Sequence, residues 1–118
     1  MTLDTTFSHP SGIAMRNYVK QTEEYALFDY QMEGVTLSVT ELHAGKATRG
    51  HSHDNPELYI FQGDAWLQLG KQKHQVSKGE MRLVEAGIFH RVHAPPGRPT
   101  RFIAVFQGSR DEKRATYK

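Results

Sequence analysis

Apolar and polar residues alternate strictly from residue 35 to residue 40, where the sequence reads Val-Thr-Leu-Ser-Val-Thr. A period of two sends successive side chains to opposite faces of a strand, and valine and threonine favour strands. This segment therefore predicts a half-buried strand. Further runs of strand length follow at residues 57–62, 65–69, 80–85 and 102–107. Glycines at positions 45, 50, 63, 70, 79, 87, 97 and 108 separate the runs and predict turns.

No segment keeps a helical spacing of apolar residues over three turns. Many short strands joined by glycine turns favour an all-β sandwich or barrel. The chain up to about Glu24 lacks a clear period. We therefore expect an N-terminal arm with the first edge elements at residues 1–34, a barrel at residues 35–108 and a polar C-terminal tail at residues 109–118.

The composition narrows the class of protein. A chain of 118 residues suits one domain, and the absence of cysteine leaves only nitrogen and oxygen ligands for any metal. The 15 basic and 13 acidic residues give a net charge of +2 and are spread along the chain, which argues against a nucleic-acid partner. No apolar run is long enough for a signal peptide or a membrane span, so we expect a cytoplasmic protein without a membrane partner.

Two histidines and a glutamate predict a metal site. His51 and His53 are two residues apart, so on a strand their rings share a face. On the same straight strand Glu57 would lie about 20 Å from His51, too far for a shared ion. The intervening Asp-Asn-Pro at residues 54–56 favours a turn, which would bring Glu57 back beside the histidines.

His90 is the fourth candidate ligand, three residues after Gly87 on a segment of strand character. Three imidazoles and one carboxylate suit a single divalent transition metal, namely iron, manganese, nickel, cobalt or zinc. Such a set leaves coordination positions open for water or substrate, which favours catalysis over a structural role.

The spacing of these residues resembles the two sequence motifs of the cupin family. The first is Gly45-x5-His51-x-His53-x3-Glu57-x5-Gly63, and the second is Gly79-x5-Glu85-x-Gly87-x2-His90. The resemblance implies a jelly-roll barrel, also called a double-stranded β-helix, with all four ligand positions filled. Three departures, the short Glu57–Gly63 spacing, Glu85 in place of proline and Ala94 in place of asparagine, affect turns more than the ligands.

Other residues near the predicted metal have less specific roles. Tyr59 is two residues after Glu57, so on a strand the two side chains share a face. Its phenol can transfer a proton, or its ring can simply fill the core. Tyr59 and Glu57 are the candidate catalytic residues. His93 could turn inward if the Pro95-Pro96 pair forces a bulge. The other three histidines, His9, His43 and His74, have no spaced partner. Several basic residues could line a rim that binds an anion, namely Lys46, Arg49, Arg82, Arg91 and Arg101.

The resemblance implies a metal-dependent enzyme that acts on a small polar or anionic molecule, but it does not choose the reaction. The segment from His90 to Phe106 is similar in outline to cupin sugar-phosphate isomerases, which favours an isomerase or epimerase. An iron-dependent dioxygenase and a non-catalytic ligand-binding cupin are the alternatives. We also expect a homodimer, since cupins commonly dimerise through edge elements and open sheet edges need cover.

Overall fold

The computed structural model describes residues 15–108 and 115–117, and that part of the chain contains strands and no helix. The strands are β1 (Met15–Gln21), β2 (Tyr25–Met32), β3 (Val35–Leu42), β4 (His51–His53), β5 (Glu57–Phe61), β6 (Ala65–Leu69), β7 (Gln72–Val76), β8 (Met81–Val84), β9 (His90–His93), β10 (Thr100–Gln107) and β11 (Ala115–Tyr117). The described residues therefore include no helix that could cross a membrane.

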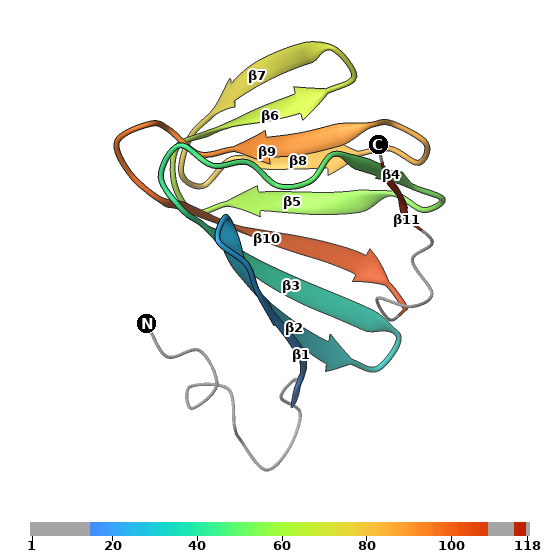
Figure 1. Ribbon diagram of the computed structural model, residues 1–118. Coiled ribbons are helices and arrows are strands. Elements are labelled where there is room, and N and C mark those ends of the chain that lie inside the picture. The colour runs from blue at the N-terminus through green and yellow to red at the C-terminus, as the bar shows by residue number, and fades with distance from the viewer. Residues whose placement is uncertain (1–14, 109–114, 118) are drawn as a thin grey trace.

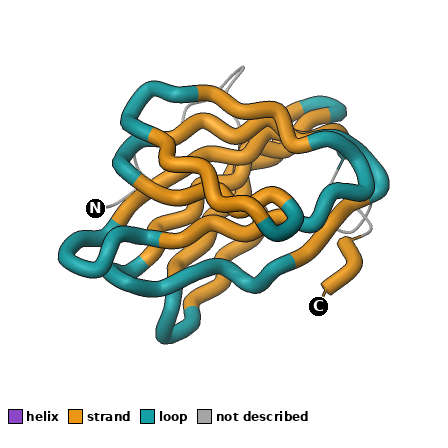
Figure 2. Tube along the Cα trace, turned by 90° about the horizontal axis from the view of Figure 1, so that it is seen from above, coloured by secondary structure: helices purple, strands orange, loops and turns teal. Residues whose placement is uncertain are grey.

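The strands form two antiparallel sheets (Figure 1). A six-stranded sheet has the order β1-β2-β3-β10-β5-β8, and a five-stranded sheet has the order β11-β4-β9-β6-β7. Strands that follow one another in the sequence often belong to different sheets, as β4 and β5 do. Viewed from above, the loops gather at the ends of the strands (Figure 2). The predicted all-β jelly roll is confirmed.

The core lies between the two sheets. Leu42 and Phe61 of the six-stranded sheet and Leu67 of the five-stranded sheet are fully buried in one apolar cluster. The rings of Tyr59 and Phe102, on neighbouring strands, are stacked with their centroids 5.3 Å apart. This packing fixes the inner face of β5, the strand that begins at Glu57.

The predicted strand positions agree with the observed strands where side chains alternate between buried and half-buried. The run predicted at residues 65–69 is β6, and the run predicted at 57–62 is β5 from Glu57 to Phe61. In β6, Ala65 and Leu67 point into the core while Trp66 and Gln68 are half-buried on the other face. A two-residue turn at Gly70-Lys71 leads into β7, and Gly70 has a φ of 62° that L side chains rarely adopt.

The alternation in β3 has an unexpected orientation. Its polar residues Thr36, Ser38 and Thr40 are buried, as are Val39 and Leu42, whereas Val35 and Leu37 are only half-buried. The polar side of the strand thus faces the space between the sheets. The interior at this point is polar rather than a continuation of the apolar core.

Strands β1 and β11 lie where the sequence shows no strand pattern. Residues 15–21 form β1 at the edge of the six-stranded sheet, and Val19, Lys20 and Gln21 are exposed there. An exposed edge strand is held by backbone pairing and needs no apolar period. Residues 115–117, within the predicted C-terminal tail, pair with β4 as β11. Residues 1–14 and 109–114 lie outside the described residues.

Candidate metal centre

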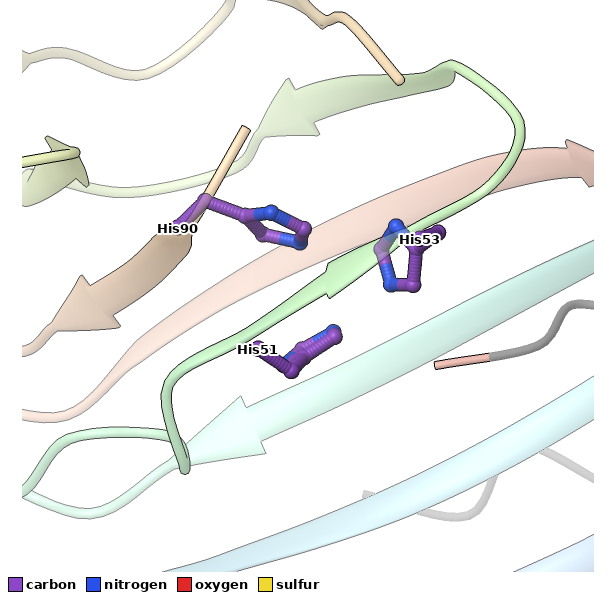
Figure 3. A group of neighbouring side chains, drawn as sticks. All are labelled: His51, His53 and His90. Carbon is purple, nitrogen blue, oxygen red and sulfur yellow. The ribbon is translucent and has the colours of Figure 1, made fainter. Parts of the chain in front are cut away.

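Three histidine rings converge between the sheets (Figure 3). His51 and His53 come from β4 and point to the same side of it, and His90 on β9 is paired directly with His51. The three ring centroids lie 4.4, 4.5 and 4.6 Å from one another, so the rings form a nearly equilateral triangle.

The spacing of the ring nitrogens suits one metal ion. One nitrogen from each of the three rings lies within 4.8 Å of the others. Metal–imidazole bonds of about 2.0–2.1 Å keep two ligand atoms no more than about 4.2 Å apart. The three histidines can therefore hold an ion after side-chain shifts of less than about 1 Å, and their imidazole nitrogens suit the transition metals named above.

Backbone carbonyls orient two of the rings. Nδ1 of His51 lies 2.9 Å from the carbonyl oxygen of Arg49, and Nδ1 of His90 lies 3.0 Å from that of Ile88. A carbonyl oxygen only accepts, so each Nδ1 carries the proton and donates it. In the neutral ring Nε2 then keeps its lone pair for a metal.

The chain changes sheets between His53 and Glu57. Residues 54 and 55 form a bend, after which β5 begins in the opposite sheet. Glu57 consequently faces the histidines, with its Oε2 3.4 Å from Nε2 of His53 and both side chains 1% exposed. The bend that the sequence required is present. The group of ligand atoms within 4.8 Å of one another contains His51, His53 and His90 and not Glu57, whose role as the fourth ligand stays a prediction.

Hydrogen bonds hold the loops around the histidines in place. The amide of Gly87 donates to the carbonyl oxygen of His53 at 2.7 Å. Gly87 has a φ of 79°, a backbone conformation that favours glycine over other residues. The amide of Thr48 donates to the carbonyl oxygen of Val92, while the amide of Val92 donates to the hydroxyl of Thr48. These hydrogen bonds thus join the segments that carry the two predicted motifs.

Gly50 is a structural requirement that the sequence analysis missed. It is buried directly before His51, and the ring of Phe89, directly before His90, lies against it. A Cβ at position 50 would overlap that ring. The contact joins the segments that carry His51 and His90. The one signal in the sequence is that Gly50 and Phe89 each stand directly before a candidate ligand.

A small cavity of about 70 Å³ opens beside the histidines. His51, Glu57 and Tyr59 form part of its wall, and Arg49, Ser38, Thr40 and Thr48 contribute polar groups. Ala104 lies between Ser38 and Tyr59 in the register of the six-stranded sheet, so a small side chain there leaves space. The remaining lining residues are Tyr25, Leu27 and Phe102.

The other basic candidates lie away from this cavity. Arg82 pairs with Glu80 at 2.7 Å, and Arg101 lies 3.6 Å from Glu41. Nε of Arg91 donates to the carbonyl oxygen of Thr48 at 2.7 Å. Lys46 is exposed. Among the five basic residues considered, Arg49 alone lines the cavity.

His93 does not join the histidine cluster. It is half-buried on β9, opposite in parity to His90, and its Nε2 donates to Oε1 of Gln68 at 2.8 Å. Burial lowers the pKa of His93 from its ordinary value, and the positive charges of Lys73 and Arg91 lower it further. His93 is therefore an outer-face residue that favours the neutral form.

The sequence matches a known domain family. The sequence model of the family described as "Cupin domain" matches residues 38–106, more than half of the chain. Among curated proteins, none is similar enough in sequence to count as a match.

Several solved structures share the fold at low sequence identity. A cupin-2 domain protein, Rru_A2000 from Rhodospirillum rubrum, is 12% identical with a TM-score of 0.75, over 86% of this chain and 73% of that one. Oxalate decarboxylase from Lactobacillus farciminis is 14% identical with a TM-score of 0.73, over 85% of this chain and 33% of that one. Salicylate 1,2-dioxygenase from Pseudoaminobacter salicylatoxidans is 14% identical with a TM-score of 0.65, over 71% of this chain and 25% of that one. The matched region thus spans about a third of the length of the decarboxylase and a quarter of the length of the dioxygenase.

Removing a candidate ligand should remove the metal. If these residues bind the ion, we expect His53→Ala, His90→Ala and Glu57→Ala each to lower metal affinity at least about tenfold, because each would delete one bond to it. Elemental analysis of untagged protein after dialysis against a weak chelator measures the effect. His74→Ala, on β7, is the matched control. Unchanged metal content in the first three variants would refute the site.

A methyl group at position 50 should disturb the site without touching a ligand. Gly50→Ala forces the Phe89 ring away, which we expect to cost about 1–3 kcal/mol of folding free energy and to weaken metal binding. Gly97→Ala is the control, because a Cβ there meets no atom within 4 Å. Equal metal affinity and melting temperature in both variants would show that the contact is unimportant.

Acidification should destabilise the protein partly through His93. Its pKa is lower in the folded chain, so below about pH 6.5 the unfolded chain binds the proton more readily and stability falls. Between pH 7 and pH 5 the melting temperature of His93→Gln should therefore fall less than that of the wild type, as measured by circular dichroism. An identical pH profile for the two proteins would contradict this assignment.

Proposed function

Because this chain belongs to the cupin family, we propose that it is a metal-dependent enzyme acting on a small polar or anionic metabolite. The observation that carries the proposal is the cavity whose wall includes His51 and Glu57 together with Tyr59. Candidate metal ligands thus adjoin the space a substrate would enter. A purely structural ion would need no such space.

The size of the cavity limits the substrate. A volume of 70 Å³ has room for a group of a few non-hydrogen atoms, given that about 10–15 Å³ on the same measure holds one water. The reacting end of a metabolite fits, and any larger group must remain toward the exposed Arg49. The oxalate decarboxylase of similar fold was solved as a formate complex, which is a ligand of comparable size.

The chemistry of the wall favours oxygen-rich ligands. The hydroxyls of Ser38, Thr40 and Thr48 can each donate to or accept from a substrate oxygen. The guanidinium of Arg49 can bind a carboxylate or a phosphate by two parallel hydrogen bonds. A hydroxy acid or a sugar phosphate carries both kinds of group.

We favour an isomerase or epimerase reaction, in which a proton leaves one carbon and returns either to the neighbouring carbon or to the opposite face of the same carbon. A divalent ion held by His51, His53, His90 and Glu57 would polarise the substrate oxygens. Tyr59 is 4% exposed, is stacked on Phe102 and has its ring 5.6 Å from that of His90. Its phenol is therefore held in one orientation beside the site, where it can give or take the proton.

An iron-dependent dioxygenase is the second candidate. The three-histidine cluster and the similar fold of salicylate 1,2-dioxygenase favour it, although a likeness at 14% identity supports the fold alone. A cupin that binds the metabolite without converting it is the third candidate.

Deuterium exchange tests the isomerase. Metal-loaded protein is incubated in D₂O with a panel of aldose and ketose phosphates and hydroxy acids, and proton NMR follows the carbon-bound hydrogens. We expect exchange with the wild type and a loss of about 100-fold or more in Tyr59→Phe, which keeps the ring but removes the acid–base group. Metal analysis of the variant is the control for an intact site.

Two other outcomes separate the remaining candidates. Oxygen uptake by the iron-loaded protein with any member of the panel would favour the dioxygenase and overturn the isomerase. Ligand binding by calorimetry without exchange or oxygen uptake would identify a binding protein.

A further inference from the structure

A second, larger cleft lies at the end of the six-stranded sheet away from the candidate ligand Glu57. Its volume is about 580 Å³, which is within the range of small-molecule sites. Glu57 is the first residue of β5, whereas Gln62 and Gly63, which line the cleft, follow the last residue of that strand. At about 3.4 Å per residue, Gln62 is about 17 Å from Glu57 along the strand. We call this space the strand-end cleft.

Two neighbouring cross-strand rows supply much of the cleft wall. In one row, Glu41 on β3 is paired with Arg101 on β10. In the next row, Leu42 is paired with both Tyr25 and Thr100. Successive residues of a strand point to opposite faces, so the cleft takes side chains from both faces of the sheet. Tyr25 is the one residue that belongs to the walls of both this cleft and the smaller cavity beside the histidines.

Two opposite charges lie side by side in this wall. Nη1 of Arg101 lies 3.6 Å from Oε2 of Glu41, and the two side chains are 32% and 34% exposed. Hydrogen bonds between such charged groups are about 2.7–2.9 Å long, so this pair is a loose one. A guanidinium has several N–H donors and a carboxylate has several lone pairs, so this contact alone does not saturate either group.

Thr100 adds a polar group that the described residues do not satisfy. The residue is 5% exposed, and its Oγ1 has no hydrogen-bond partner in the part of the chain that the structure describes. A buried hydroxyl without a partner costs folding free energy. In the wall of a cleft, such an atom favours a ligand that supplies the missing hydrogen bond.

Gly63 leaves space beside this hydroxyl. Its φ is not positive, so the backbone conformation does not require a glycine at this position. A Cβ on Gly63 would lie 2.9 Å from Oγ1 of Thr100, which is closer than real Cβ contacts. The requirement for glycine is therefore steric. Gly63 closes the first sequence motif, and neither the candidate metal site nor the proposed reaction uses it.

We propose that the strand-end cleft binds a free α-amino acid with an apolar or aromatic side chain. Such a molecule carries a carboxylate and an ammonium group on one carbon, and these match the adjacent Arg101 and Glu41. Its polar end can also supply the hydrogen bond that Thr100 lacks. Its side chain would pack against Tyr25 and Pro99, which line the cleft. A ligand with a single charge would bring a like charge to one of the two protein groups, which weakens binding.

This site is separate from the proposed enzyme function. None of the candidate metal ligands lines the strand-end cleft. The sequence analysis considered Arg101 for an anion-binding rim near the metal, whereas the structure places it in this second wall. The proposal therefore stands or falls without reference to the metal or to the reaction.

Isothermal titration calorimetry of the full-length protein tests the proposal. Phenylalanine and leucine are the zwitterionic probes, and 3-phenylpropionate and phenethylamine each lack one of the two charges. We expect saturable binding of the amino acids with a dissociation constant of about 1 millimolar or lower, and binding of the two analogues at least about tenfold weaker. Metal-free and metal-loaded protein should give the same affinities.

Two variants test the charged pair. Arg101→Gln and Glu41→Gln should each weaken phenylalanine binding about tenfold or more, because each removes one of the two charges that the ligand meets. Arg82→Gln is the matched control, since it breaks an ion pair of similar exposure outside the cleft and should bind like the wild type. Circular dichroism spectra equal to that of the wild type show that each variant is folded.

Thr100→Val separates a ligand contact from a structural role. The variant keeps the shape of the side chain and removes only the hydroxyl, so the melting temperature of the ligand-free protein should stay the same or rise. Affinity for phenylalanine should fall about tenfold. A wild type that binds neither amino acid at about 10 millimolar overturns the proposal. Equal binding of the singly charged analogues, or unchanged affinity in Thr100→Val and Arg101→Gln, overturns it as well.

Discussion

The structure around the candidate site depends on one short crossing of the chain between two sheets. β4 ends at His53 in the five-stranded sheet, and β5 begins at Glu57 in the six-stranded sheet. Because of this crossing, residues four apart in the sequence face each other across the interior, 3.4 Å apart at Nε2 and Oε2. A straight strand would separate them by about 13 Å at about 3.3 Å per residue. The cavity and the position of Tyr59 both follow from this geometry.

The crossing also places ionisable groups where water is scarce. His53, Glu57 and His90 are 3%, 1% and 1% exposed, beside an apolar cluster that includes Phe61 and Val92. Burying such groups costs free energy unless hydrogen bonds, opposite charges or a metal compensate. A cation bound among them would offset this cost, so metal affinity and folding stability are linked in this protein. The carbonyl oxygens of Arg49 and Ile88 already orient two of the rings for that purpose.

The period of two gives the two faces of β5 different side chains. Its inward residues are Glu57, Tyr59 and Phe61, and its outward residues are Leu58 and Ile60. Packing on the inward face holds the candidate site, while the outward residues are half-buried. In β3 the inward residues Thr36, Ser38 and Thr40 are polar, and two of them, Ser38 and Thr40, form part of the cavity wall.

The amino-acid sequence by itself determined the fold class, most strand positions and the four candidate ligands, because these depend on local features. Alternation defines strands, glycines define turns, and Asp-Asn-Pro at residues 54–56 required a bend. Only the tertiary structure decided which face of each strand is buried, as for β3 and β6, because alternation has the same period for either orientation. It also decided that β1 forms through backbone pairing, that Gly50 contacts Phe89 and that Arg49 reaches the cavity. Each of these contacts joins segments whose proximity is set by the packing of two sheets, and no local pattern of residues records that packing.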